Sequence, residues 1–131
     1  MNPRRNLILS TSLFAIPGIY GLYKQQYVLS FTSFASMAAS INYWRNPVVG
    51  SRKNIDLFVS KSCGVIYFIY GYYNINTTYL RLLGYTNCIF TASMYNTSCI
   101  LHEMNSDTWE LYHMLFHVFG VIGKMLVISA A

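Results

Sequence analysis

Charged side chains are scarce in this chain, and acidic ones are the scarcest. Four of its 131 residues are Asp or Glu, and charged residues of both signs together make up 10%. A di-iron site needs several carboxylates from neighbouring helices, so this composition does not favour one. The low density of charge also argues against a voltage-sensing helix, which carries a row of basic side chains.

Cysteine and long polar segments are scarce as well. The three cysteines, Cys63, Cys88 and Cys99, lie within apolar stretches and have no Cys-x-x-Cys or Cys/His spacing, which argues against a disulfide framework. No solvated domain is available to present the basic residues, so the net charge of +5 does not indicate a nucleic-acid partner. We therefore expect no nucleic-acid binding.

Apolar and aromatic residues are abundant instead. Hydrophobic residues make up 54% of the chain and aromatic residues 17%. Such a composition is typical of membrane proteins, where aromatic rings settle between hydrocarbon and headgroups. We expect an integral, multi-pass membrane protein in contact with the lipid bilayer, and we favour an endomembrane.

Five segments have the length and composition of membrane-spanning helices. A helix needs about 20 mostly apolar residues to cross roughly 30 Å of hydrocarbon. The expected spans are 6–23, 27–44, 55–73, 78–100 and 108–128. Short polar connections separate them, so consecutive helices should be antiparallel neighbours, and Pro17 with Gly18 should kink the first one. The sequence therefore predicts an all-α fold, with residues 1–131 forming a single membrane domain.

The positions of the basic residues predict the orientation of this bundle. Five crossings place the N-terminus and the connections at 45–54 and 101–107 on one side of the bilayer. That side carries Arg4, Arg5, Arg45, Arg52 and Lys53. Basic residues are enriched on the cytoplasmic side, so we expect a cytoplasmic N-terminus.

The last span carries polar residues on one face. Glu110, His113 and His117 fall within about 60° of one another on a helix that turns 100° per residue. Ser40 and Asp56 lie in two other predicted spans, near the same side of the membrane. Ionisable residues inside a membrane normally face the interior of the bundle and mark a functional site.

These residue types are compatible with a metal site. Imidazoles at positions i and i+4 of one helix can bind the same ion, and a carboxylate from a neighbouring helix can be a third ligand or orient a bound water. Zinc would lower the pKa of that water and create a nucleophile.

The same residues carry a resemblance to a known superfamily. The pattern consists of Ser-x-x-Tyr-Trp at 40–44, Asp56 after a short connection, and Glu-Leu-Tyr-His-x-x-x-His at 110–117. It resembles the superfamily of alkaline ceramidases and adiponectin-type (PAQR) receptors, which are seven-helix membrane proteins, several of them zinc-dependent hydrolases of lipid amides. This chain would be a reduced relative, with five spans and with Trp44 where the family has its first histidine ligand.

The resemblance implies a function and a role for each residue. It implies a zinc-dependent hydrolase of a lipid amide or ester, with a lipid substrate and a site near the cytoplasmic face. Ser40 would lie beside the metal, Asp56 would hold the metal-bound water, and His113 and His117 would be ligands. Apart from the resemblance, His102 in the connection before the last span could supply a missing ligand, although nothing in its spacing requires this.

A non-enzymatic interpretation remains open beside this one. His113 and His117 would then form hydrogen bonds between helices, as polar residues in membrane bundles commonly do. Asp56 would be an acid favoured by the first turn of its helix, and Lys124 would extend to the membrane surface. The chain would be a structural or accessory subunit of a larger assembly, with membrane-protein partners or further copies of itself.

Overall fold

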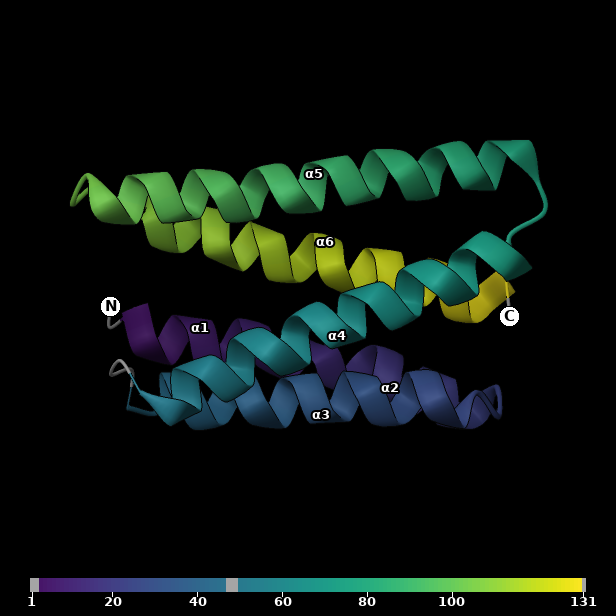
Figure 1. Cartoon of the computed structure of the whole chain (residues 1–131), viewed down its shortest axis with the longest axis horizontal. Helices are drawn as coiled ribbons and strands as arrows, with labels where there is room; N and C mark the ends of the chain where they lie inside the picture. Colours follow the sequence, from purple (N-terminus) through teal and green to yellow (C-terminus); the bar gives the residue numbers. More distant parts are fainter. Residues whose placement is uncertain (1–2, 47–49, 131) are drawn as a thin grey trace.

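The computed structural model describes residues 3–46 and 50–130, and these residues form helices joined by short connections (Figure 1). The predicted all-α class is confirmed for this part of the chain. The elements are α1 (Pro3–Thr11), η1 (Ser12–Phe14), α2 (Ala15–Tyr23), α3 (Tyr27–Trp44), α4 (Ser51–Asn74), α5 (Thr78–Glu103) and α6 (Trp109–Ala130).

The first predicted span is interrupted where a kink was expected. The 3-10 turn η1 separates α1 from α2 and ends at Phe14, shortly before Pro17. Proline cannot donate a backbone hydrogen bond, so the turn before it in the helix is the one that changes geometry. Elsewhere α3 has the predicted bounds, while α4 begins at Ser51 rather than Ile55 and α5 continues to Glu103 rather than ending at Ile100.

Two helical stretches of the described chain are long and apolar enough to cross a membrane, Arg5–Tyr23 and Trp109–Ala130. The other three long helices carry more polar residues and do not pass this test of composition. Length and composition therefore establish a helical protein with two candidate membrane spans. They do not establish the predicted bundle of five membrane-spanning helices.

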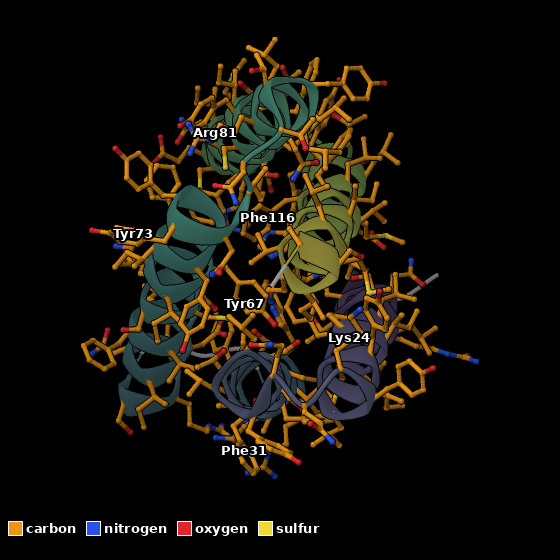
Figure 2. All side chains as sticks on the ribbon, turned by 90° about the vertical axis from the view of Figure 1, so that its right-hand side faces the viewer. Lys24, Phe31, Tyr67, Tyr73, Arg81 and Phe116 are labelled. Atoms are coloured by element: carbon orange, nitrogen blue, oxygen red, sulfur yellow. The ribbon has the colours of Figure 1, made fainter. Side chains whose placement is uncertain are left out.

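The last helix, α6, packs against helices on both sides of the bundle. It contacts α1, α2, α4 and α5, while α3 packs on α1, α2 and α4. The expectation that all consecutive helices pack together is wrong for α4 and α5, which diverge from their short connection (Figure 2). The anchoring groups of α5 face α6 instead: Asn87 Nδ2 donates to the carbonyl oxygen of Phe119 at 3.0 Å, and the rings of Phe90 and Phe119 stack with their centroids 5.8 Å apart.

A row of serines lets α3 lie close to the helices of the first span. Ser30, Ser33, Ser36 and Ser40 are all buried. Ser30 Oγ donates to the carbonyl oxygen of Gly18 at 2.6 Å, and Ser33 Oγ donates to that of Phe14 at 2.8 Å. Small hydroxyl side chains of this kind combine close helix packing with hydrogen bonds that need no water.

The contact between α2 and α3 requires a glycine at position 21. A Cβ atom added to Gly21 would lie 3.0 Å from Ser30 Cβ and 3.2 Å from the Ser30 backbone nitrogen. Since the backbone of α3 would have to move, we expect Gly21→Ala to lower the free energy of unfolding by about 1–3 kcal/mol, measured by thermal unfolding in detergent. Gly64→Ala is the matched control, because a Cβ there meets no atom within 4 Å. Equal effects of the two substitutions would contradict this close approach.

Candidate functional site

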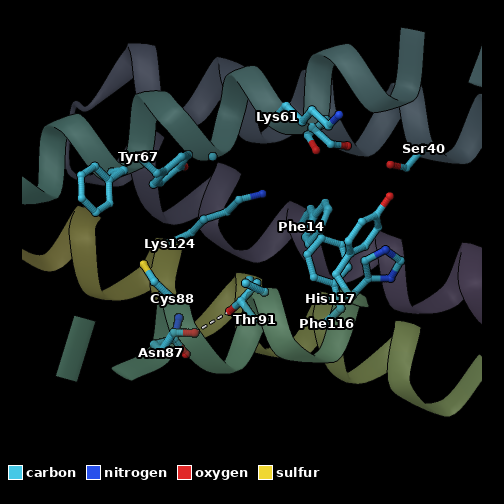
Figure 3. A pocket seen from close by; sticks show the side chains of 18 of the residues that line it. Phe14, Ser40, Lys61, Tyr67, Asn87, Cys88, Thr91, Phe116, His117 and Lys124 are labelled. Atoms are coloured by element: carbon cyan, nitrogen blue, oxygen red, sulfur yellow. Dashed lines mark hydrogen bonds between the residues drawn. The ribbon is translucent and has the colours of Figure 1, made fainter. Parts of the chain in front are cut away.

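A cavity of about 700 Å³ fills the space between the diverging helices α4 and α5 (Figure 3). It is lined by α4 on one side and α5 on the other, with α6 and the end of α3 between them. The cavity is half-open, because α4 and α5 do not pack against each other, and most of its wall is apolar. We call this cavity the groove.

Asp56 and Ser40 meet at one end of the groove, as the sequence predicts for neighbouring spans. Ser40 Oγ donates to Asp56 Oδ1 at 2.5 Å, and Ser60 Oγ approaches the same oxygen at 3.4 Å. Asp56 is buried and lies in the second turn of α4, because this helix begins at Ser51. The alternative interpretation as a first-turn acid is therefore wrong, and Asp56 is held by hydrogen bonds from side chains instead.

His113 and His117 lie together on α6, with ring centroids 4.8 Å apart and ring planes at 90°. Both line the groove, and His117 is 3% exposed. His117 Nδ1 lies 2.7 Å from Ser10 Oγ, which also donates to the carbonyl oxygen of Leu7 at 3.1 Å. A hydroxyl has one hydrogen, so both contacts are satisfied when the imidazole Nδ1–H donates to Ser10. That tautomer leaves the lone pair on Nε2.

The first helix contributes to this region, which sequence analysis did not predict. Besides the contact of Ser10 with His117, Asn6 Nδ2 donates to Glu110 Oε1. Glu110 lies in the first turn of α6, where the helix dipole favours an acid, and it accepts this hydrogen bond as well. Asn6 and Ser10 lie four residues apart, so they share one face of α1, and the residues between them, 7–9, are all apolar. This spacing was the signal that the sequence offered.

Aromatic rings surround His113 at the Asp56 end of the groove. The Trp44 ring centroid lies 5.3 Å from that of His113 and 6.2 Å from that of Trp109. The predicted third ligand, His102, packs edge-on against Trp109 with centroids 4.9 Å apart. An indole thus lies beside His113 at the position where the resemblance expects another histidine.

These residues do not fit the predicted zinc ion. Within residues 3–46 and 50–130, no three His, Cys, Asp or Glu side chains are close enough together to hold a metal. Zinc sites in proteins have at least three such ligands. The zinc site stays a prediction from the resemblance, and the hydrogen bonds of Asp56 and His117 do not require it.

Lys124 lies inside the groove rather than at the membrane surface. Its Nζ is 3.8 Å from the centroid of the Phe14 ring and 5.6 Å from that of Tyr67 (Figure 3). The expectation that Lys124 extends outward is therefore wrong. Helical side chains point toward the N-terminus of their helix, and here that direction leads along the groove wall.

Comparisons with protein-family models, with curated proteins and with solved structures find no match to this chain. The relationship to the ceramidase and adiponectin-receptor superfamily therefore stays a prediction.

Proposed function

We propose that this chain is a five-span membrane protein that binds one lipid amide, lipid ester or similar amphiphile in the groove between α4 and α5. The observation that carries the proposal is the shape and lining of the groove. Its volume of about 700 Å³ lies within the usual range of small-molecule sites, and its wall is mainly apolar with a few polar groups. The groove is partly open on the side between α4 and α5, so a ligand can enter it from the bilayer.

The outer surfaces of the helices support a position in the membrane. Large apolar side chains are widely exposed, among them Phe31 at 66%, Phe58 at 73% and Ile89 at 66%. Exposed apolar area on this scale is unfavourable in water and ordinary against acyl chains. The basic residues at 45–54 then favour the orientation with the N-terminus in the cytoplasm.

The Asp56 end of the groove is suited to a polar headgroup. The Asp56 carboxylate, the Ser40 hydroxyl and the His113 ring line the groove there; the carboxylate and the hydroxyl oxygen offer acceptors, and the ring offers an N–H donor to the carbonyl group of an amide or ester. Apolar wall extends from this end along α4, α5 and α6, where an acyl chain would lie. The resemblance to lipid amide hydrolases supports the same class of ligand.

The Ser10–His117 pair does not present a nucleophile to such a ligand. Ser10 lies beside His117, but Ser10 is buried and does not line the groove. Its hydrogen bond joins α1 to α6 and fixes the orientation of the imidazole. Ser10 therefore joins two helices and does not contact a ligand in the groove.

A second candidate function is that of an accessory subunit. It is favoured by the attachment of α5, which packs on α6 and leaves its other faces exposed, so that a helix of a partner protein could lie against α4 and α5. In that case the polar residues would join helices and the groove would bind no lipid.

Filling the groove tests the proposal. Gly64 lines the groove, and a Cβ there meets no atom within 4 Å, so Gly64→Trp places an indole in the cavity without displacing a neighbour at its base. We expect the affinity for a fluorescent palmitoyl amide to fall by at least about tenfold, measured by titration of the detergent-purified protein.

The matched control is Val65→Trp. Val65 is the next residue of α4, is 58% exposed and does not line the groove. We expect this variant to bind the palmitoyl amide as the wild type does. If the wild type does not bind the amide, or if both variants bind it equally, the groove is not a site for lipid amides and the accessory role is favoured.

A further inference from the structure

Lys124 is a cation without a counter-ion in the wall of the groove. Its side chain lines the cavity between the rings of Phe14 and Tyr67, and within residues 3–46 and 50–130 no carboxylate lies within 4.0 Å of its Nζ. The face of an aromatic ring attracts an ammonium group but does not neutralise it.

The acidic side chains of the chain are engaged elsewhere. Asp56 accepts hydrogen bonds from serines at one end of the groove, and Glu110 accepts one from Asn6. Glu103, the last residue of α5, and Asp107, in the connection to α6, are both exposed. A charge among apolar walls is costly unless an opposite charge accompanies it. The missing partner of Lys124 would therefore come from a ligand.

The groups near Lys124 limit the chemistry of that ligand. Tyr67 Oη already donates to the carbonyl oxygen of Leu29 at 2.7 Å, and Asn87 Nδ2 donates to that of Phe119 at 3.0 Å. The Tyr67 hydroxyl thus has no hydrogen left for a ligand, and the Asn87 amide has one, so the Lys124 ammonium is the charged donor among these three groups. A phosphate headgroup, with its larger charge and additional oxygens, is best recognised by several donors or by the fork of an arginine. One carboxylate, with a single negative charge, is balanced by one lysine.

We infer that the groove binds a long-chain fatty acid whose carboxylate pairs with Lys124 and whose acyl chain lies along the apolar wall. This inference rests on the proposed function, since it names the charged member of the same class of amphiphiles. The pair is neutral as a whole, which is the condition for placing either charge among apolar side chains. Tyr67, Phe14 and Leu126 line the groove and provide apolar surface for the chain next to the carboxylate.

The experiment compares an acid with an alcohol of the same chain length. Binding of palmitate and of hexadecanol to the detergent-purified full chain is measured for the wild type, Lys124→Met and Lys124→Arg. Methionine has an unbranched apolar side chain that suits the apolar wall, so the bundle should remain folded, and thermal unfolding of each variant verifies this.

We expect Lys124→Met to weaken palmitate binding by at least about tenfold and to leave hexadecanol binding unchanged. Lys124→Arg keeps the charge and should keep the preference for the acid over the alcohol. Lys24→Met is the control for general loss of positive charge, because Lys24 is exposed and does not line the groove. Palmitate that binds Lys124→Met as tightly as wild type, or an equal loss for acid and alcohol, overturns the inference.

The palmitoyl amide separates this inference from the proposed function. If wild type binds the amide, Gly64→Trp abolishes that binding and Lys124→Met has no selective effect on palmitate, the groove is a lipid site and the role of Lys124 is refuted. If wild type binds neither the amide nor palmitate, both proposals are refuted.

Discussion

His117→Ala is expected to lower the free energy of unfolding by about 3 kcal/mol or more, the largest effect of a single substitution that we expect at the site. The His117 ring is 3% exposed, packs edge-on against Phe14 with centroids 5.4 Å apart, and pairs with Ser10 at 2.7 Å. Its removal leaves a cavity between α1 and α6 and takes away the partner of a buried hydroxyl. Chemical unfolding in detergent measures the change.

Two further variants show whether the hydrogen bond contributes to this loss. Val118→Ala removes a half-exposed side chain from the next position of α6 and should change stability by less than about 1 kcal/mol. Combining His117→Ala with Ser10→Ala should cost less than the sum of the two single effects, because both remove the same bond. A loss for His117→Ala no larger than that for Val118→Ala would show that the imidazole does not join the helices.

Metal analysis of the same preparations tests the alternative role of the histidines. Zinc bound one-to-one in the wild type and lost in a His113→Ala, His117→Ala double variant would support the zinc site expected from the resemblance. The described geometry leads us to expect no such stoichiometric zinc, because two imidazoles beside an indole lack a third ligand.

Leu29→Ala is expected to lower the free energy of unfolding by about 2–5 kcal/mol, measured by the same unfolding titration. Leu29 is 0% exposed and belongs to the core cluster that joins α3, α4 and α6, together with Cys63, Tyr67 and Val127. The side chain is enclosed by protein, so lipid cannot fill the space that the substitution leaves. Lost packing contacts then determine the cost, even where no water is displaced.

Val28→Ala is the control for Leu29→Ala. Val28 is the preceding residue of α3 and is 51% exposed. Acyl chains or detergent replace the lost contacts there, so its effect should stay below about 1 kcal/mol. Similar losses at both positions would mean that α3 does not use Leu29 to face the core.

The helices of this chain could be predicted because their signals are local. The segment 27–44 is apolar, lies between polar connections and forms α3 with the predicted bounds. The expectation that Ser40 and Asp56 lie at the same end of their helices also followed from local information, since a short connection brings the end of one helix to the start of the next, and the structure adds the hydrogen bond between them. The polar face of α6 follows from helical periodicity alone.

The packing of α5 could not be predicted in this way. A short connection of residues 75–77 indicates that α4 and α5 are antiparallel, but the side chains that fasten α5, Asn87 and Phe90, find their partners on α6. Whether α5 packs against α4 or against α6 depends on the complementarity of side chains that lie far apart in the sequence. The groove exists because of this choice, so its presence was not visible in the sequence.

The site residues on α1 were missed for a related reason. Ser10 and Asn6 are short polar residues that also occur as packing residues in membrane helices, so their type alone does not distinguish a partner of His117 from a neutral position. Lys124 was placed at the surface because it lies near the end of its helix. Its direction along the groove depends on Phe14, which is more than a hundred residues away in the chain.

The hydrogen bonds from Asn6 to Glu110 and from Ser10 to His117 connect the beginning of the polypeptide to its last helix. During synthesis, α1 leaves the ribosome long before either partner has been made. Asn6 and Ser10 therefore have no partner on α6 until that helix has been made, and a product truncated before Trp109 would leave both side chains without these hydrogen bonds.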